Sequence, residues 1–89
     1  MADNEETLLE FPCTFAVKAL GASADDFESL VHAIVANHVD DLPLDATRSR
    51  PSAKGNYTSV TVTFTARSKA QLDAIYRSLT AHNRIKMAI

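Results

Sequence analysis

The stretch Pro51-Ser52-Ala53-Lys54-Gly55-Asn56-Tyr57, which leads into Val60-Thr61-Val62-Thr63-Phe64-Thr65-Ala66, decides the fold. Apolar residues and threonine alternate strictly over its second half. This period of two predicts a strand with one buried face and one hydroxyl-bearing face. Gly55 precedes the strand and can adopt a positive φ, so the segment is predicted to form the second half of a hairpin. The pattern defines an architecture but not a chemical activity.

The remaining elements follow from periodicity and from capping residues. Ser23 is a predicted helix cap, followed by an apolar stripe that ends near Asn37-His38. Ser68 and Gln71 form a predicted capping box for a second helix, which is expected to end at His82-Asn83 with the asparagine in the left-handed region. Four strands are expected, at residues 13–20, 44–51, 57–66 and 85–89, with a turn at residues 21–22 after the first of them.

The order strand, helix, strand, strand, helix, strand predicts an α+β ferredoxin-like split βαβ sandwich (βαββαβ). It is a four-stranded antiparallel sheet with both helices on one face. The expected core residues are Phe15, Val17, Leu30, Ile34, Val62, Phe64, Leu72, Ile75 and Met87. The open face of the sheet is expected to carry Lys18, Thr61, Thr63, Thr65, Arg84 and Lys86.

Length and composition indicate one small domain. Of 89 residues, 46% are apolar and 22% charged, a profile typical of a globular protein. We expect a disordered acidic tail at residues 1–9 and a single domain at residues 10–89. The sequence contains no apolar run of about 20 residues and no positively charged start of a signal peptide. With a single cysteine, these features predict a cytoplasmic protein.

Charge is distributed unevenly along the chain. Residues 1–45 hold ten of the eleven acidic residues and one basic residue, whereas residues 46–89 hold eight basic residues and one acidic residue. The two halves therefore carry −9 and +7. Either they interleave in space and neutralise each other, or they form a dipolar surface that steers an anionic partner or a second copy.

No combination of residues predicts catalysis or metal binding. Cys13 has no evident base as a partner, and His32 and His38 are six residues apart, which does not suit zinc chelation on a helix. They are expected to be surface histidines. The acidic clusters at residues 25–28 and 40–41 are explained by helix capping and solvation. We therefore expect no enzyme activity, no cofactor and no metal.

Two segments remain candidates for contact with a partner. The turn needs Gly55 and Asn56, but it does not explain Lys54 and Tyr57. Arg67-Ser68-Lys69 opens the second helix with two cations and could hold a carboxylate or phosphate, although ordinary capping also explains it. The predicted sheet face carries threonines where RNA-binding domains of this topology carry aromatic residues, so nucleic-acid binding is not expected.

The segment Leu9-Glu10-Phe11-Pro12-Cys13-Thr14-Phe15, with Lys18, Gly21 and Pro51 to Val60, resembles the YbeD-like family of small bacterial proteins. The similarity covers about residues 8–89. It implies a ferredoxin-like fold akin to ACT regulatory domains. Family members are of unknown function, and a loose proposal links them to regulation of lipoate or amino-acid metabolism. The resemblance brings no catalytic residues.

Two functions are therefore considered. The first is an ACT-like, metabolite-responsive regulatory domain that binds its ligand near Gly21. The second is a protein-interaction adaptor that uses the 52–57 turn and the open sheet face. Their combined candidate residues are Lys18, Gly21, Ser52, Lys54, Gly55, Asn56 and Tyr57. Like charges on the open face favour a monomer over a homodimer that pairs through this face.

Overall fold

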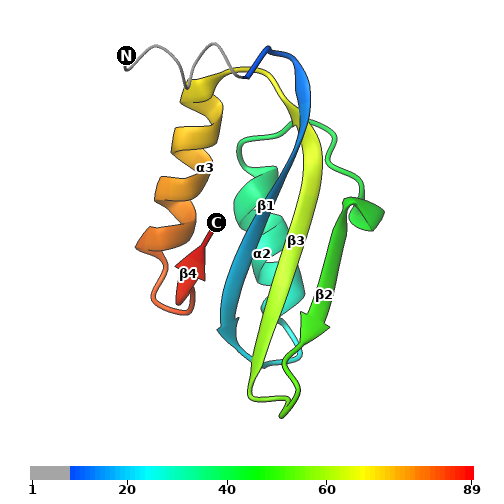
Figure 1. Ribbon diagram of the computed structural model, residues 1–89, viewed down its shortest axis with the longest axis vertical. Helices are drawn as coiled ribbons and strands as arrows, with labels where there is room; N and C mark the ends of the chain where they lie inside the picture. The colour runs from blue at the N-terminus through cyan, green and yellow to red at the C-terminus, as the bar shows by residue number, and fades with distance from the viewer. Residues whose placement is uncertain (1–8) are drawn as a thin grey trace.

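The computed structural model describes residues 9–89, so the predicted acidic tail lies almost wholly outside the described residues. The elements in chain order are β1 (Cys13–Ala22), α2 (Phe27–Ala36), the short 3₁₀ helix η1 (Leu44–Ala46), β2 (Thr47–Pro51), β3 (Tyr57–Ala66), α3 (Lys69–Ala81) and β4 (Met87–Ala88). The two long strands form the middle of the sheet, and the helices lie behind and beside them (Figure 1).

The sheet is antiparallel throughout, in the order β2-β3-β1-β4. β1 and β3 pair along their full length, from Cys13 opposite Ala66 to Ala22 opposite Tyr57. The alternation of Val, Phe and Ala with Thr in β3 sets this register, since a slip of one residue would expose the apolar set. The predicted ferredoxin-like βαββαβ architecture is confirmed.

The core lies between the sheet and the two helices. Val17, Val62 and Ile75 are fully buried, and the rings of Phe15 and Phe64 meet with centroids 6.3 Å apart. Of the residues predicted to be buried, Phe15, Leu30 and Ile34 are only partly buried at its margin, and the following are buried: Val17, Val62, Phe64, Leu72 and Ile75. The predicted burial of Met87 is wrong, because its side chain is 53% exposed.

The error at Met87 comes from the phase of the last strand. Ile85 is buried in a turn, where its N–H donates to the carbonyl of His82, and the strand begins only at Met87. Met87 lies opposite Leu20 and therefore shares the open face. Since facing alternates along a strand, this phase also excludes Lys86 from the open face.

The starts of the helices differ in their capping. The Ser68 hydroxyl accepts a hydrogen bond from the Gln71 N–H at 3.0 Å, as predicted for α3. Ser23 does not cap α2, which begins after Asp26 without a side-chain cap. The predicted turn at Gly21-Ala22 is also wrong, because both residues continue β1.

The structure also differs from the sequence predictions at one loop residue and at two histidines. Among the described residues other than glycine, Asp41 has a positive φ, of 56°, and Asn83 does not. His32 and His38 are partly buried rather than surface residues. The His32 Nδ1 lies 2.6 Å from the Thr47 hydroxyl, and the His38 Nε2 lies 2.9 Å from the Ser78 hydroxyl. Each ring therefore links α2 or its end to another element.

Candidate functional site

The turn between β2 and β3 is closed by its own hydrogen bonds. The Ser52 N–H donates to the Tyr57 carbonyl at 2.7 Å, and the Tyr57 N–H donates to the Ser52 hydroxyl at 3.2 Å. Gly55 has a φ of 77° and donates its N–H to the Ser52 carbonyl. Ser52 and Gly55, both candidates for binding, thus have structural roles.

The structure brings this turn to the same end of the sheet as Gly21. The Ser23 N–H donates to the Asn56 carbonyl at 3.0 Å, and the Ser23 hydroxyl lies 2.7 Å from the Thr58 hydroxyl. Both segments appear at the lower end of Figure 1. Lys18 is not part of this end, because it lies further along β1 on the open face, opposite Thr61.

Gly21 is a packing residue. A Cβ atom at this position would lie 2.5 Å from the Arg84 carbonyl oxygen and 2.5 Å from two ring atoms of Phe27. The space beside Gly21, where an ACT-like domain would be expected to hold a metabolite, is therefore filled by the protein's own atoms.

Replacing Lys54 with alanine should change the free energy of unfolding by less than about 0.5 kcal/mol, the usual value for a surface residue. Lys54 is exposed, and none of the hydrogen bonds and ion pairs among residues 9–89 involves its side chain. Ser52→Ala is the matched comparison and should cost about 1 kcal/mol, because it removes a turn-closing acceptor. Equilibrium urea unfolding measures both. An equal or larger loss for Lys54→Ala would contradict its assignment as a free surface residue.

Asp26 and Arg84 form a bidentate ion pair beside this end of the sheet. The two terminal nitrogens of the Arg84 guanidinium donate to the two carboxylate oxygens of Asp26 at 3.1 and 2.8 Å. The hydrogen bond from Arg84 is the main cause that holds the pKa of Asp26 below its ordinary value of 3.8. The same contact raises the pKa of Arg84. The pair joins the start of α2 to the segment before β4 and explains why the Asp26 side chain does not cap its helix.

The stability that this ion pair contributes should disappear in acid. Because the pKa of Asp26 is lower in the folded state, its contribution is present above the ordinary pKa and is lost as the pH falls through the lowered value. We expect wild type to be more stable than Asp26→Asn near neutral pH, and the difference to shrink between about pH 5 and about pH 2. Asp25→Asn is the control, since Asp25 has no such partner among the described residues. A difference that is independent of pH would contradict this role.

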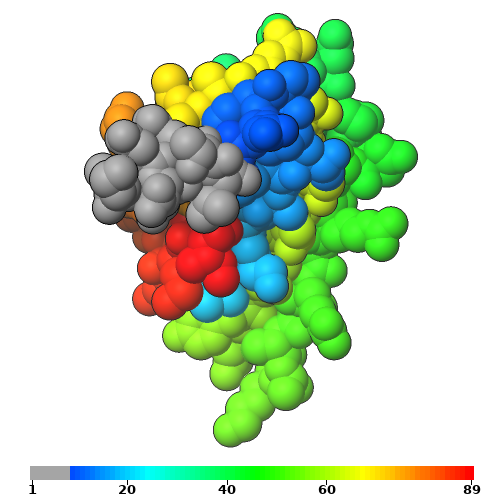
Figure 2. Space-filling model, turned by 45° about the horizontal axis from the view of Figure 1, so that its top comes forward, coloured from blue at the N-terminus to red at the C-terminus, as the bar shows by residue number. Residues whose placement is uncertain are grey.

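Two neighbouring rows of side chains on the open face of the sheet contain its basic residues. One row is Arg48, Thr61, Lys18 and Ile89, and the other is Arg50, Ser59, Leu20 and Met87. Neighbouring strands lie about 4.8 Å apart, so Arg48 and Lys18 are separated by about 10 Å at the backbone. The long side chains of β2 project from the edge of the molecule (Figure 2).

The charged side chains of this face are basic. The strand residues that share it include Lys18, Arg48 and Arg50 but no aspartate or glutamate. Within residues 9–89 none of these three cations forms an ion pair. The prediction from sequence included Lys18 but missed the two arginines. Their spacing of two residues within the expected strand 44–51 was the signal that places both on one face.

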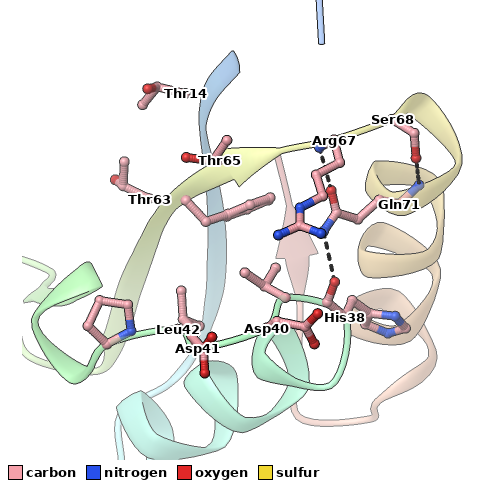
Figure 3. Close-up of a pocket in the computed structure, with 13 residues that line it drawn as sticks. Thr14, His38, Asp40, Asp41, Leu42, Thr63, Thr65, Arg67, Ser68 and Gln71 are labelled. Atoms are coloured by element: carbon pink, nitrogen blue, oxygen red, sulfur yellow. Dashed lines mark hydrogen bonds between the residues drawn. The ribbon is translucent and has the colours of Figure 1, made fainter. Parts of the chain in front are cut away.

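The other end of the sheet has an open hollow of about 870 Å³ beside β3. Its walls come from the loop after α2, the end of β3 and the start of α3 (Figure 3). In the predicted Arg67-Ser68-Lys69 site, Ser68 caps the helix and Lys69 pairs with Asp73 at 3.2 Å. Arg67 and Ser68 line the hollow, and the Arg67 side chain extends into it (Figure 3).

The described part of the chain contains no evident metal site and no evident membrane-spanning helix. Between residues 9 and 89, no three side chains of histidine, cysteine, aspartate or glutamate are grouped as metal ligands. None of the helices in this range is long and apolar enough to cross a membrane. The lone Cys13 is partly buried against the core.

Comparison with known proteins finds matches over nearly the whole chain. Residues 6–89 match the family described as "Protein of unknown function (DUF493)". The chain belongs to the DUF493 family. A UPF0250 protein of Neisseria gonorrhoeae is 42% identical over 87 residues, covering 98% of this chain and 96% of its own length. A UPF0250 protein of Paraburkholderia phytofirmans is 39% identical, and the match covers both chains completely. The YbeD-like resemblance read from the sequence agrees with this assignment.

A solved structure supports the fold. The solution structure of protein HP0495 from H. pylori matches with a TM-score of 0.69 and covers 91% of this chain and 85% of its own. The two sequences are 11% identical, so the similarity concerns architecture alone. This DUF493 domain therefore has the ferredoxin-like fold, and its family is one of unknown function.

Proposed function

We propose that this DUF493 protein is a non-catalytic adaptor that binds an acidic surface of another protein through its open sheet face. One observation carries the proposal: Lys18, Arg48 and Arg50 share this face with no aspartate or glutamate among its strand residues. Unpaired cations on a face without acidic side chains attract an anionic partner and fix its orientation.

The chemistry of the face favours a protein over a nucleic acid. Apart from Lys18, the two central strands present mainly hydroxyl groups and small apolar side chains on this face. Tyr57 is an aromatic residue of this face and lies at its extreme end, opposite Ala22. Single-stranded nucleic acids need several stacking residues for affinity, whereas Leu20 and Met87 at the β4 side give a protein partner apolar contact area.

The ACT-like, metabolite-responsive alternative has less support. Its expected ligand position near Gly21 is occupied by the Phe27 ring and the Arg84 carbonyl. It stays a prediction that a thermal-shift screen with amino acids, lipoate and nucleotides can examine. A ligand at 100 times its Kd stabilises a protein by about 2.7 kcal/mol, so a metabolite that binds the domain would raise its melting temperature clearly.

The adaptor proposal is tested by comparing two charge reversals in affinity capture from a bacterial lysate. Arg48→Glu lies on the open face, and Arg77→Glu is an exposed position on α3. We expect wild type and Arg77→Glu to retain a set of partner proteins that Arg48→Glu does not retain. These partners should elute as the salt concentration rises, because salt screens the charges. The purified partner should then bind wild type with an affinity at least about tenfold higher than its affinity for Arg48→Glu.

Two outcomes would contradict the adaptor. Equal retention by Arg48→Glu and wild type would remove the open face from recognition. Loss of retention after nuclease treatment would identify a nucleic acid as the bound species.

A further inference from the structure

β3 extends beyond its neighbour on one side. β2 pairs with Thr58–Val62 only, whereas β3 continues to Ala66 and pairs with β1 along its whole length. Within residues 9–89, the last four residues of β3 therefore have a strand on one edge and none on the other. The chain before β2 turns into η1 rather than extending alongside β3.

The direction in which the backbone groups at the end of β3 point follows from the pairing of β1 with the chain around β4. Lys18 exchanges two backbone hydrogen bonds with Ile89, at 2.7 and 2.8 Å, so its N–H and carbonyl point toward β4. In an antiparallel pair the direction alternates along each strand. Thr61 lies opposite Lys18 and thus directs its backbone groups away from β1, toward β2. Thr63 and Thr65, at intervals of two, do the same.

At Thr63 and Thr65 there is no longer a strand to receive these groups. The alternation places the Thr63 N–H opposite the carbonyl of Ala46, because Thr47 and Val62 form the wide pair with which β2 begins. The Ala46 N–H donates instead to the Pro43 carbonyl at 3.1 Å, so the Thr63 carbonyl and both outward groups of Thr65 face no strand. Both residues are exposed, and both line the hollow beside β3. The Thr63 carbonyl and the Thr65 N–H and carbonyl are thus edge groups with which an extended chain can pair.

The walls of the hollow are held in place. The Gln71 side chain accepts a hydrogen bond from the Arg67 N–H at 2.7 Å and donates one to the His38 carbonyl at 2.8 Å. It thereby ties the end of β3 and the loop after α2 to the start of α3 (Figure 3). Leu42 and Phe64 add apolar surface to the lining. The hollow needs little reorganisation before it binds a ligand.

Charge in the hollow gives a preference for one kind of side chain. The Arg67 guanidinium extends into the hollow, and among residues 9–89 it forms no ion pair, including with Asp40 or Asp41 of the same lining. An unpaired guanidinium at a binding site favours a carboxylate, with which it can form two parallel hydrogen bonds.

We propose that this hollow binds an extended peptide segment of another protein, which adds a short strand to the free edge at Thr63–Thr65 and places an acidic side chain against Arg67. Main-chain hydrogen bonds would supply affinity, and alternate side chains would contact Leu42 and Phe64 on one face. β2 limits the pairing to about four residues of β3, or about 13 Å, which suits a peptide segment. The site lies at the other end of the sheet from the row of Arg48, Thr61 and Lys18, and it does not rest on the adaptor proposal.

A library of random linear peptides displayed on phage is the probe, with the full chain as bait. We expect enrichment of sequences that combine β-branched residues with aspartate or glutamate. In the selected peptides, N-methylation of the central backbone amides should abolish binding, because it removes the donors that β3 requires. Amide hydrogen exchange at Thr65 should slow when the peptide binds, while exchange in β4 should not change.

Two variants locate the site on the protein. Thr65→Pro removes the outward N–H, which has no internal acceptor among the described residues, and proline is tolerated on a strand edge. It should abolish binding of the peptide while the melting temperature stays near that of wild type. Arg67→Glu should weaken binding by about tenfold or more, and Arg77→Glu is the matched charge reversal that should leave it unchanged. If Thr65→Pro fails to fold, Arg67→Glu and the N-methylated peptide still decide the outcome.

The proposal would be overturned by several results. One is a selection without enrichment, and another is a peptide whose affinity is unaffected by N-methylation. A third is a concentration-dependent increase in mass by light scattering that Thr65→Pro abolishes, since this would assign the edge to a second copy of the chain.

Discussion

Phe64→Ala should lower the free energy of unfolding by about 3–5 kcal/mol, the usual cost of truncating a buried phenylalanine. Phe64 is 6% exposed, lies in the central strand and packs its ring against that of Phe15. A domain of this size has a total stability of only about 5–10 kcal/mol, so much of the variant should be unfolded near physiological temperature. Equilibrium urea unfolding followed by circular dichroism measures the loss.

The neighbouring residue provides the control for Phe64. Thr65 lies on the opposite face and is exposed, so Thr65→Ala should change the free energy of unfolding by less than about 0.5 kcal/mol. A loss below 1 kcal/mol for Phe64→Ala, or equal losses for the two variants, would mean that β3 pairs with β1 in a different register.

The central part of the fold could be predicted because its sequence pattern is long and regular. Ten residues of β3 alternate with few exceptions, and only one phase buries Val62 and Phe64 together. Ser68 and Gln71 likewise define the start of α3 by local chemistry that needs no tertiary information. In both cases local preference and burial favour the same structure.

The last strand could not be predicted in the same way. Residues 85–89 alternate between apolar and other side chains, but β4 itself has only two residues. Ile85 is buried by a turn that precedes the strand, and Met87 then lies on the open face opposite Leu20. A short alternating segment gives the period but not the phase, because the phase depends on where pairing begins.

The candidate sites show a similar division. The sequence singled out the 52–57 turn, because the turn does not explain Lys54 and Tyr57, and it offered the segment Arg67-Ser68-Lys69 as a second candidate. It could not show that Arg48 and Lys18 meet in one row, since that depends on the strand order β2-β3-β1. The free edge at Thr63–Thr65 was equally hidden, because it arises from the unequal lengths of β2 and β3.

Gly21→Ala should be among the most destabilising single substitutions, at about 3 kcal/mol, the upper end of the usual cost of overpacking. Its added Cβ would lie 2.5 Å from the Arg84 carbonyl oxygen and 2.5 Å from the Phe27 ring. The ring is fully buried, and the carbonyl belongs to backbone, so neither can move aside as a flexible side-chain end would. Equilibrium urea unfolding measures the loss.

Substitutions at Gly55 provide the comparison, because there the cost is conformational, whereas at Gly21 it is steric. A Cβ at Gly55 would meet no atom within 4 Å, but its φ of 77° is unfavourable for alanine, so Gly55→Ala should cost about 1–2 kcal/mol. Asparagine tolerates the left-handed region, and Gly55→Asn should therefore be milder than Gly55→Ala, whereas Gly21→Asn should be worse than Gly21→Ala because it is larger. If Gly21→Ala were nearly neutral, the space beside Gly21 could adapt. The metabolite-binding alternative would then regain the room that the Phe27 ring now denies it.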